Sequence, residues 1–270
     1  MLSNLQRTAV VNPLLSTQSG PLVIAHRGNS AHAPENTIEA FRQAIALGAD
    51  GIEFDVRLTR DGRAIVMHDP AVDRTTSGTG LVADLTYDRI RTLDAGARFA
   101  KPDAPAPYAG RGVYAPLLED VLDAFPSTPC IIELKTKEAA PEVLRIVRER
   151  NAAERCVVGS FVDDALAAFE GTGLALSAST RQLAALLWRG VLRRGILRVP
   201  FQCVSTPRSH RFFPLPIAGW TRVLEPLGVP VHVWTIDDPA VARRLWRKGV
   251  RGILTNDVPA ILAARSRPTG

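Results

Sequence analysis

The sequence lacks the features that mark membrane-spanning, disulfide-linked and zinc-binding proteins. No run approaches the roughly 18 apolar residues needed to cross a bilayer. The three cysteines, Cys130, Cys156 and Cys203, are odd in number and far apart, which argues against a disulfide framework and against the paired spacing of zinc sites. Residues 1–20 lack the continuous apolar stretch of a secretory signal. We therefore expect a flexible leader at 1–20 and a cytoplasmic protein.

The sequence also lacks the strong positive charge of a nucleic-acid-binding protein. Thirty-three Lys and Arg against 27 Asp and Glu give a net charge of only +6 over 270 residues. The surplus gathers near 181–211, and no nucleic-acid recognition motif accompanies it. This balance favours a small anionic substrate or a lipid surface over nucleic acid.

What the chain does contain is a succession of short apolar runs separated by segments with helical patterning. Eight strand–helix units in succession predict an α/β fold, a (β/α)8 TIM-type barrel, as one catalytic domain over 21–265. Such a barrel carries its active site at the C-terminal ends of its strands. The predicted strands are 22–25, 51–58, 130–134, 156–160, 174–178, 201–205, 230–235 and 251–254.

Two of the intervening helices have recognisable ends. Asn36 is expected to cap the first helix, which Gly48 ends. Near the other terminus, Asp238 followed by Pro239 is expected to open a helix that Gly249 ends.

A ninth run, 63–67, follows the second strand too closely for a parallel crossover, so it must return antiparallel. With Asp61-Gly62 as a two-residue hairpin turn, the register places His68 opposite Asp55. Residues 70–116, rich in Gly, Pro, Asp and Thr, are too long for a normal loop. We expect a small insertion there, after the hairpin, with a short helix around 84–93 over the barrel mouth.

Acidic side chains fall where the predicted strands present them to a common site. Glu53 and Asp55 share one face of the second strand, and Glu133 lies in the third barrel strand. If these faces point inward, three carboxylates converge, and such a cluster is costly unless it is protonated or bound to a cation. Oxygen ligands without a cysteine cluster indicate Mg²⁺ or Ca²⁺.

Basic and aromatic residues surround this predicted metal site. His26 and His68 can exchange protons near neutral pH and so could act as a general acid and base. Arg27 and Lys135 add fixed positive charge, which suits a phosphate ester. Trp234, at the end of the seventh barrel strand, either fills the core or packs against the rest of the substrate.

Taken in order, these motifs resemble the glycerophosphodiester phosphodiesterase family over about residues 22–263. The motifs are AHRGNSAHAPENTIEAF (25–41), GIEFDVRLTRDGRAIVMHD (51–69), IIELK (131–135), VHVWTIDDP (231–239) and GILTNDVP (252–259). The resemblance implies a TIM-type barrel in which one divalent cation, Mg²⁺ or Ca²⁺, serves to hydrolyse glycerophosphodiesters to an alcohol and sn-glycerol 3-phosphate.

The resemblance also assigns roles to individual positions. They are metal ligands at Glu53, Asp55 and Glu133, acid and base at His26 and His68, phosphate contacts at Arg27 and Lys135, and a substrate-pocket aromatic at Trp234. The sequence does not tell which histidine is the acid, nor whether water or the glycerol 2-hydroxyl attacks first.

The segment 181–217 is more basic and more apolar than a barrel segment requires. It is interpreted as a solvated barrel face, with peripheral membrane contact as the alternative. Such a surface would suit a lysophospholipase D-like or sphingomyelinase D-like hydrolase of lipid phosphodiesters. An alternative of another class is a non-catalytic metal- or lipid-binding barrel.

Overall fold

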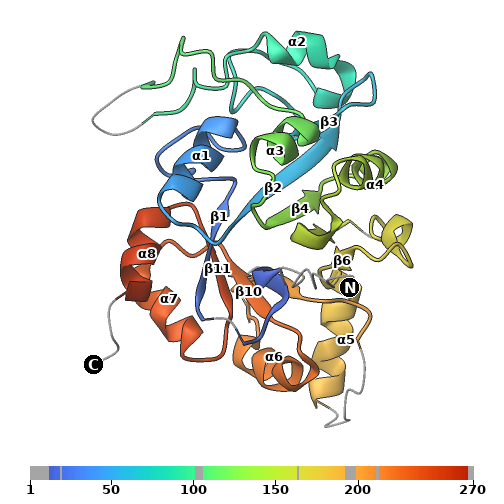
Figure 1. Ribbon diagram of the computed structural model, residues 1–270, viewed down its shortest axis with the longest axis vertical. Helices are drawn as coiled ribbons and strands as arrows, with labels where there is room; N and C mark the ends of the chain where they lie inside the picture. Colours follow the sequence, from blue (N-terminus) through green and yellow to red (C-terminus); the bar gives the residue numbers. More distant parts are fainter. Residues whose placement is uncertain are drawn as a thin grey trace, which may run out of the picture.

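Parallel strands form one curled sheet with helices on its outer side (Figure 1). The computed structural model describes residues 12–18, 20–100, 106–162, 164–191, 199–210 and 213–266. The strands lie in the order β6-β5-β4-β2-β1-β11-β10-β7, and a parallel bridge between Ser177 and Cys203 joins the segments beside the two end strands. The fold is therefore of the TIM-barrel type.

The parallel strands match the predicted runs closely except near the middle of the chain. They are β1 (Leu22–His26), β2 (Gly51–Leu58), β4 (Cys130–Leu134), β5 (Cys156–Ser160), β6 (Ala175–Leu176), β7 (Val204–Pro207), β10 (Val231–Trp234) and β11 (Gly252–Thr255). The run predicted at 174–178 is shorter in the structure, and the run predicted at 201–205 begins three residues later. A short antiparallel pair, β8 (Ser209–His210) with β9 (Phe213–Pro214), was not foreseen.

Helices follow most of the strands. The α-helices are α1 (Ile38–Ala46), α2 (Tyr87–Arg91), α3 (Leu118–Ala124), α4 (Ala140–Glu149), α5 (Thr180–Val191), α6 (Ile217–Leu224), α7 (Pro239–Trp246) and α8 (Val258–Ser266). Single 3₁₀ turns are η1 (Pro13–Leu15), η2 (Val82–Asp84), η3 (Lys137–Ala139), η4 (Ala153–Arg155), η5 (Ala167–Phe169) and η6 (Glu225–Leu227). Within the described residues, no helix is both long and apolar enough to pass through a bilayer.

The period-two alternation of the strands separates two apolar layers. Phe54 and Ile132 belong to the cluster that packs between the sheet and the helices, whereas Ile131, Val157 and Leu254 belong to a smaller cluster inside the sheet. Because Phe54 faces the helices, its neighbours along β2 face the inside of the barrel. This alternation turns acidic residues of β2 toward the interior.

Residues 12–18 are not a flexible leader, contrary to our expectation. Leu14 is fully buried within the inner cluster, and its carbonyl accepts a hydrogen bond of 2.8 Å from the buried His232 ring. Asn12 caps η1 by accepting from the Leu14 backbone NH at 3.0 Å. The local pattern Asn-Pro-Leu-Leu therefore forms a plug for the barrel interior. Residues 1–11 lie outside the described part of the chain.

Three of the four predicted helix ends are confirmed. Gly48 and Gly249 take left-handed φ angles of 97° and 87° just after α1 and α7 end. Asp238 caps α7 as expected, accepting from the backbone NH of Ala240 at 2.7 Å. The cap of α1, however, is Thr37, whose hydroxyl accepts from the Ala40 NH at 3.2 Å. Asn36 precedes this cap with a left-handed φ of 57°. Its side-chain amide donates to Asp55 and not to the backbone of α1.

The hairpin of β2 with β3 (Ala64–Val66) has a different register from the one predicted. Val56 pairs with Val66, and the Thr59 NH donates to the Arg63 carbonyl at 3.0 Å, so the loop contains three residues and not two. Gly62, at φ 74°, takes the left-handed position that such a loop requires. The prediction that His68 lies opposite Asp55 is therefore wrong, because the Met67 NH donates to the Asp55 carbonyl at 2.9 Å.

The segment after the hairpin has its own apolar cluster. Val72, Val82, Ile90 and Leu93 pack there against Ile65 of β3. It contains η2 and α2, and α2 lies inside the range 84–93 where a helix was predicted. Residues 101–105 are outside the described part.

Candidate active site

Strand register brings the three predicted carboxylates together. Glu53 of β2 lies beside His26 of β1, and Asp55 lies beside Glu133 of β4. Side chains that pair across parallel strands point to the same face, here the inner one. One oxygen from each carboxylate lies within 4.8 Å of the others. Carboxylates about 80 residues apart in the chain therefore share one site.

The buried position of this cluster makes full ionisation unfavourable. Burial and then the charges of Asp55 and Glu133 raise the pKa of Glu53 well above its usual range. Burial likewise raises the pKa of Glu133, against the opposing effect of Lys135. Among the described residues, the ion-pair contact of Glu53 is with His26 Nε2 at 4.0 Å.

Asp55 is the carboxylate that the protein itself neutralises. Although burial opposes its ionisation, Lys135 and Arg27 lower the pKa of Asp55. Lys135 Nζ lies 2.8 Å from its Oδ1, and Arg27 Nε lies 3.1 Å from its Oδ2. The Asn36 amide also donates to Oδ2 at 2.9 Å. Lys135 is shared with Glu133, at 2.5 Å.

The donor set fits a hard divalent cation. Three carboxylates face two cationic groups, the Arg27 guanidinium and the Lys135 ammonium. Among the described residues, neither of these charged groups forms an ion pair with Glu53. A cation among the three oxygens would offset the repulsion that raises the pKa of Glu53. Oxygen-only ligation is typical of Mg²⁺ and Ca²⁺. The residues present therefore fit a divalent metal ion.

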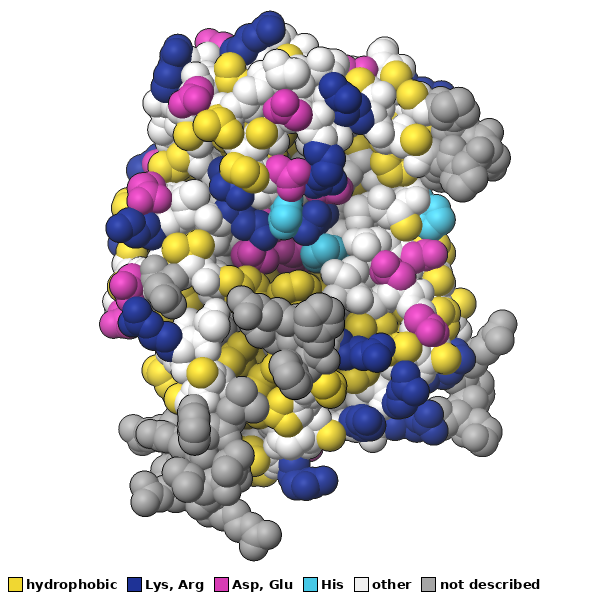
Figure 2. Space-filling view, turned by 180° about the vertical axis from the view of Figure 1, so that it is seen from behind, with side chains coloured by type: hydrophobic (Ala, Val, Ile, Leu, Met, Phe, Trp, Pro, Cys, Tyr) yellow, Lys and Arg dark blue, Asp and Glu magenta, His cyan; other side chains and the backbone are white. Residues whose placement is uncertain are grey.

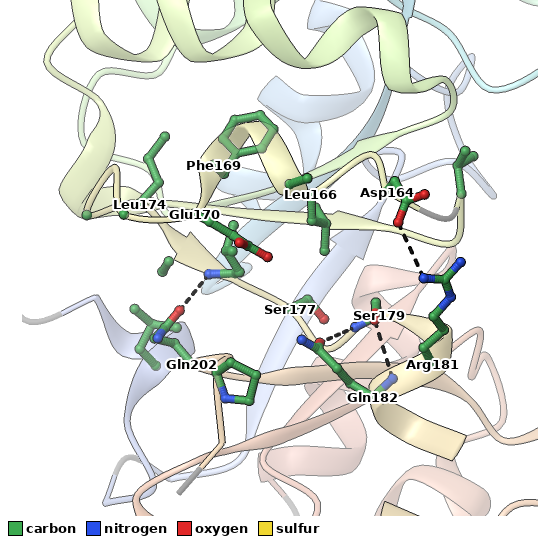
Figure 3. Close-up of a pocket in the computed structure, with 18 residues that line it drawn as sticks. Asp164, Leu166, Phe169, Glu170, Leu174, Ser177, Ser179, Arg181, Gln182 and Gln202 are labelled. Atoms are coloured by element: carbon green, nitrogen blue, oxygen red, sulfur yellow. Dashed lines mark hydrogen bonds and ion pairs between the residues drawn. The ribbon is translucent and has the colours of Figure 1, made fainter. Parts of the chain in front are cut away.

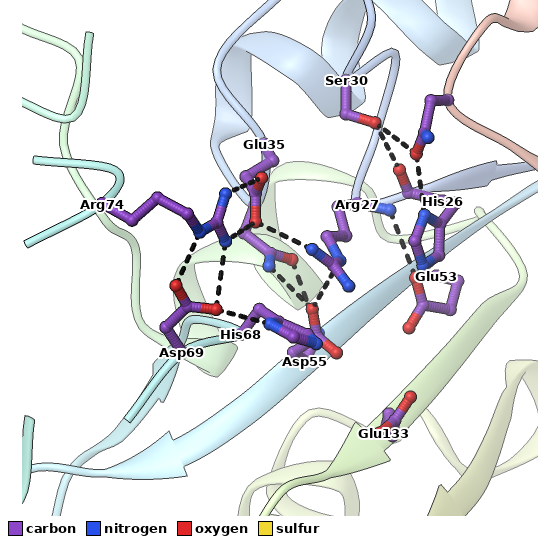
Figure 4. A network of polar contacts seen from close by, with 12 residues as sticks. His26, Arg27, Ser30, Glu35, Glu53, Asp55, His68, Asp69, Arg74 and Glu133 are labelled. Atoms are coloured by element: carbon purple, nitrogen blue, oxygen red, sulfur yellow. Dashed lines mark hydrogen bonds and ion pairs between the residues drawn. The ribbon is translucent and has the colours of Figure 1, made fainter. Parts of the chain in front are cut away.

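His26 is held by a neutral amide. Its Nδ1 lies 2.8 Å from Asn256 Oδ1, and the Asn256 amide nitrogen donates to Asp237 at 3.1 Å, which fixes which end of the amide faces the ring. His26 Nδ1 is therefore the donor, and Nε2 faces Glu53 (Figure 4). Burial and then Arg27 lower the pKa of His26, so the ring keeps a free Nε2 lone pair near neutral pH.

His68 is held by a carboxylate. It follows β3, and its Nδ1 lies 2.6 Å from Asp69 Oδ1. The hydrogen bonds of Arg74 and His68 lower the pKa of Asp69 below its ordinary value. Since Asp69 is an ionised acceptor, Nδ1 of His68 is a donor and Nε2 is the nitrogen left for the site.

The turn after β1 places Arg27 over the cluster. Arg27 and Gly28 both have positive φ, 58° and 84°. A Cβ on Gly28 would lie 2.6 Å from the Ala40 Cβ, so only glycine permits α1 to pack this closely. The Arg27 backbone NH also donates to Glu53 Oε2 at 3.2 Å. The turn thus contributes a backbone donor and a guanidinium to one site.

These groups line a cavity of about 180 Å³. Figure 2 shows histidine side chains beside basic and acidic ones in a recess on this face, with hydrophobic side chains along one border. On the apolar wall, Trp234 packs against Phe161 with ring centroids 5.4 Å apart. Phe161 directly follows β5 and is 39% exposed. The cavity therefore has a charged side and an aromatic side.

Comparisons with known proteins identify the family of this chain. Residues 26–260 match the model of the Glycerophosphoryl diester phosphodiesterase family. The chain belongs to this family. A glycerophosphodiester phosphodiesterase of Caldanaerobacter subterraneus subsp. tengcongensis is 32% identical over 251 residues, which cover 89% of this chain and 96% of that protein.

Solved structures of family members share the fold. A glycerophosphodiester phosphodiesterase from Agrobacterium tumefaciens superposes with a TM-score of 0.71 at 26% identity, covering 89% of this chain and 99% of that one. An Oleispira antarctica phosphodiesterase, solved with the product sn-glycerol-3-phosphate, has a TM-score of 0.73 at 22% identity over 92% and 97% of the two chains. At 22% identity, the similarity to the Oleispira antarctica structure shows a shared fold and nothing more.

The structure brings all eight predicted site residues of this family member into or beside one cavity, and it adds partners that the sequence patterns did not reveal. Asn36, Asn256, Asp69, Glu35 and Arg74 hold the predicted residues in place. Their side chains come from turns, where strand periodicity gives no information. For Asp69 alone, the sequence offered a hint of this role, because it directly follows the candidate histidine His68.

The other histidines with described side chains lie apart from the cluster. His32 pairs with Asp257 at 3.2 Å, and His232 is buried against the Leu14 carbonyl. His32 thus belongs to an ion pair outside the cluster, and His232 is a packing residue of the barrel interior. The His210 side chain lies outside the description.

A larger cavity of about 840 Å³ lies beside η5, β6 and α5 (Figure 3). Its polar lining includes Asp164, Glu170, Arg181 and Gln202, and the described residues that line it include neither a histidine nor a member of the acidic cluster. The groups suited to acid–base and metal chemistry line the smaller cavity instead.

Proposed function

We propose that this protein hydrolyses glycerophosphodiesters to an alcohol and sn-glycerol 3-phosphate. The observation that carries the proposal is the convergence of Glu53, Asp55 and Glu133 between two histidine rings, in a chain that belongs to the glycerophosphoryl diester phosphodiesterase family. The 32% identical relative is itself named a glycerophosphodiester phosphodiesterase.

A divalent cation at the three carboxylates, Mg²⁺ or Ca²⁺, would supply Lewis-acid polarisation of the phosphoryl oxygens. The remaining roles belong to the protein. Arg27 and Lys135 lie beside the cluster and would hold the other phosphate charge, since fixed cations in a dry pocket stabilise developing negative charge. Trp234 would pack against the non-phosphate part of the substrate.

The two histidines would divide the proton transfers. Each ring donates Nδ1–H to a fixed acceptor and keeps Nε2 for the pocket, so one Nε2 can take the proton of the nucleophile and the other can give one to the leaving alkoxide. The nucleophile is either water or the glycerol 2-hydroxyl, and trapping a cyclic phosphate would identify the second route.

The leaving group provides a test of which histidine is the acid. Loss of a general acid slows release of a poor leaving group such as choline far more than release of 4-nitrophenol, which needs no protonation. We expect one of His26→Ala and His68→Ala to lose much less activity on the nitrophenyl diester than on glycerophosphocholine. Equal losses on both substrates in both variants would contradict a divided acid–base role.

The proposal is tested by release of glycerol 3-phosphate from glycerophosphocholine, glycerophosphoethanolamine and glycerophosphoglycerol, with Mg²⁺ or Ca²⁺ supplied. We expect turnover that a chelator abolishes and that excess metal restores. His26→Ala and His68→Ala should each lose several orders of magnitude. Metal binding without hydrolysis of any diester would overturn the proposal in favour of a non-catalytic barrel.

A second candidate is hydrolysis of lysophospholipids or of sphingomyelin-like choline lipids, because of the apolar border of the cavity. Phe161 and Val162 are exposed by 39% and 38% where β5 ends. Such side chains could contact an acyl chain. Comparing turnover on lysophosphatidylcholine micelles with that on glycerophosphocholine, in wild type and in Phe161→Ala, would distinguish the two substrate classes.

We also propose that the segment 181–217 makes peripheral contact with a membrane surface in the cytoplasm. The cysteines are free and buried, which suits a reducing compartment. The segment begins with the amphipathic helix α5, whose Leu183 and Leu186 are buried in the core. The side of α5 left for a membrane is therefore the one with Arg181, which is 69% exposed and suits anionic headgroups. Its residues 192–198 and 211–212 lie outside the described part. Sedimentation with anionic and with neutral vesicles would test the contact.

A further inference from the structure

A continuous chain of ion pairs runs from His68 to Arg27, and Arg74 is at its centre (Figure 4). Arg74 donates from Nε to Asp69 Oδ2 at 2.6 Å and from Nη2 to Asp69 Oδ1 at 3.1 Å. Its two terminal nitrogens reach the two oxygens of Glu35 at 2.7 and 2.8 Å. One guanidinium thus joins two carboxylates in a planar, two-sided arrangement.

Both oxygens of Asp69 are fixed by Arg74, and one of them is also the acceptor for His68. Oδ1 lies 2.6 Å from His68 Nδ1. Because Arg74 contacts both oxygens, the Asp69 carboxylate cannot rotate without breaking two hydrogen bonds. The hydrogen bonds of Arg74 are also the main reason why the pKa of Asp69 is lowered, so that Asp69 remains an acceptor.

Glu35 anchors the other side of the guanidinium. Its side chain is mostly buried and also accepts from Arg27 Nη1 at 3.0 Å. Burial opposes its ionisation, but Arg74 and Arg27 lower the pKa of Glu35. Arg74 is therefore held between an ionised carboxylate of the β1–α1 turn and an ionised carboxylate beside His68.

The backbone that carries Arg74 is itself fixed. The Val72 NH donates to the Gly80 carbonyl at 3.0 Å, and the Thr76 NH donates to the Val72 carbonyl at 3.0 Å. Val72 and Thr76 are buried on either side of Arg74. Arg74 is thus presented by a rigid loop, as a preorganised supporting residue requires.

Stability alone does not account for this arrangement. The Arg74 side chain is 49% exposed, and exposed ion pairs contribute little to folding. Arg145 on α4 offers a comparison, because its side chain is also 49% exposed and also bridges two carboxylates, Glu142 and Glu149. Arg145 pairs within one helix surface, whereas Arg74 connects to an acid–base histidine.

We propose that Arg74 is a positioning residue for catalysis. By fixing the Asp69 carboxylate, it keeps the Nδ1–H of His68 on Asp69 and the Nε2 of His68 directed at the substrate. Its effect on turnover rests on the function proposed above, whereas its effect on the His68 ring does not.

The kinetic test compares Arg74→Gln with Arg145→Gln as the matched control. We expect Arg74→Gln to lower kcat on glycerophosphocholine about 10- to 100-fold, a loss of the size typical when hydrogen-bonding partners around a metal site are removed. Arg145→Gln should stay within twofold of wild type. Arg74→Lys should fall between, because an ammonium cannot reproduce the fork that spans both carboxylates. Melting temperatures check that every variant is folded.

A double-mutant cycle tests the route through Asp69. If Arg74 acts through Asp69, then adding Arg74→Gln to Asp69→Asn should change kcat less than twofold. Adding it to Glu35→Gln should still lower kcat about 10-fold or more. Equal losses from Arg74→Gln in the Asp69→Asn background and in wild type would overturn the proposal.

A spectroscopic measurement separates this proposal from the proposed activity. In protein labelled with ¹⁵N-histidine, with His68 assigned by the His68→Gln variant, we expect a hydrogen-bonded Nδ1–H signal in wild type and in Arg145→Gln. That signal should be lost or mixed with the other tautomer in Arg74→Gln. An unchanged His68 signal in Arg74→Gln would overturn the proposal, even if no diester is hydrolysed.

Discussion

The two histidine rings of the site differ in the residue that orients them. His26 faces the amide of Asn256, and His68 faces the carboxylate of Asp69. The Asn256 amide is itself oriented by Asp237 at 3.1 Å and accepts from the Ser30 hydroxyl at 2.9 Å. Orientation of His26 therefore depends on a loop at the far end of the chain.

Removing the Asn256 amide should release the His26 ring. We expect Asn256→Ala to lower kcat about 10- to 100-fold, because neutral His26 would then divide between two tautomers. Ser30→Ala removes a hydroxyl that lies 2.9 Å from the same oxygen and 2.8 Å from the His26 carbonyl, but it leaves the acceptor of the His26 ring in place. It should therefore lower kcat less than Asn256→Ala. Steady-state kinetics on glycerophosphocholine checks both variants. Equal losses in the two variants would refute the orienting role of Asn256.

Sequence periodicity was informative for residues within strands and uninformative for their partners. Alternation along β2 was enough to predict that Glu53 and Asp55 share a face, and register with β4 adds Glu133. By contrast, the contact of His26 with Asn256 spans 230 positions and joins the last residue of β1 to the loop after β11. No local pattern indicates such a contact, so the orienting residues emerged only from the structure.

At the scale of elements, the β2–β3 hairpin brings His68 to the cavity as predicted, although the predicted register was wrong. A three-residue loop replaces the predicted two-residue turn, which moves Met67 and not His68 opposite Asp55. His68 still lines the cavity because the chain leaves β3 there and Asp69 holds the ring. The strand itself and its antiparallel direction followed from spacing alone.

The N-terminal plug is the second element that the sequence patterns did not reveal. Its buried contact, Leu14 with His232, joins residues 218 positions apart. Desolvation lowers the pKa of His232 to about 4, although the hydrogen bond to Leu14 opposes this shift. The ring is therefore neutral in the folded protein over the whole neutral range.

This buried ring makes stability depend on pH. Between its ordinary pKa of 6.5 and about 4, the unfolded state binds a proton that the folded state refuses, so stability is lost as pH falls. We expect about 2 kcal/mol less stability at pH 5 than at pH 7.5 from this group. His232→Gln should remove that part of the slope in urea unfolding curves. An unchanged slope would contradict the assignment.

At the scale of the whole molecule, the excess of positive charge coexists with a buried acidic centre. The net charge is +6, yet three carboxylates lie within 4.8 Å of one another inside the barrel. Composition therefore pointed to an anionic substrate but could not reveal the acidic cluster. That cluster followed from placing strand ends at one mouth of the predicted barrel.

Without a bound metal ion, repulsion within the acidic cluster should lower the free energy of unfolding relative to a variant that lacks one of the three carboxylates. Glu53→Gln removes a group whose pKa is raised by burial and by its acidic neighbours. We expect the metal-free variant to melt at least about 2 °C above metal-free wild type, the shift that roughly 1 kcal/mol gives in a domain of this size. The stabilisation that Mg²⁺ or Ca²⁺ gives wild type should be absent. A variant that is less stable yet still stabilised by metal would count against the cluster as the metal site.

The most direct test of the account is a crystal structure of the protein grown with Ca²⁺. We predict one ion inside the barrel, with an oxygen of Glu53, of Asp55 and of Glu133 each at about 2.3–2.6 Å and a histidine ring on either side. An ion bound elsewhere, or an empty cluster with Lys135 still joining Asp55 to Glu133 at saturating Ca²⁺, would contradict it.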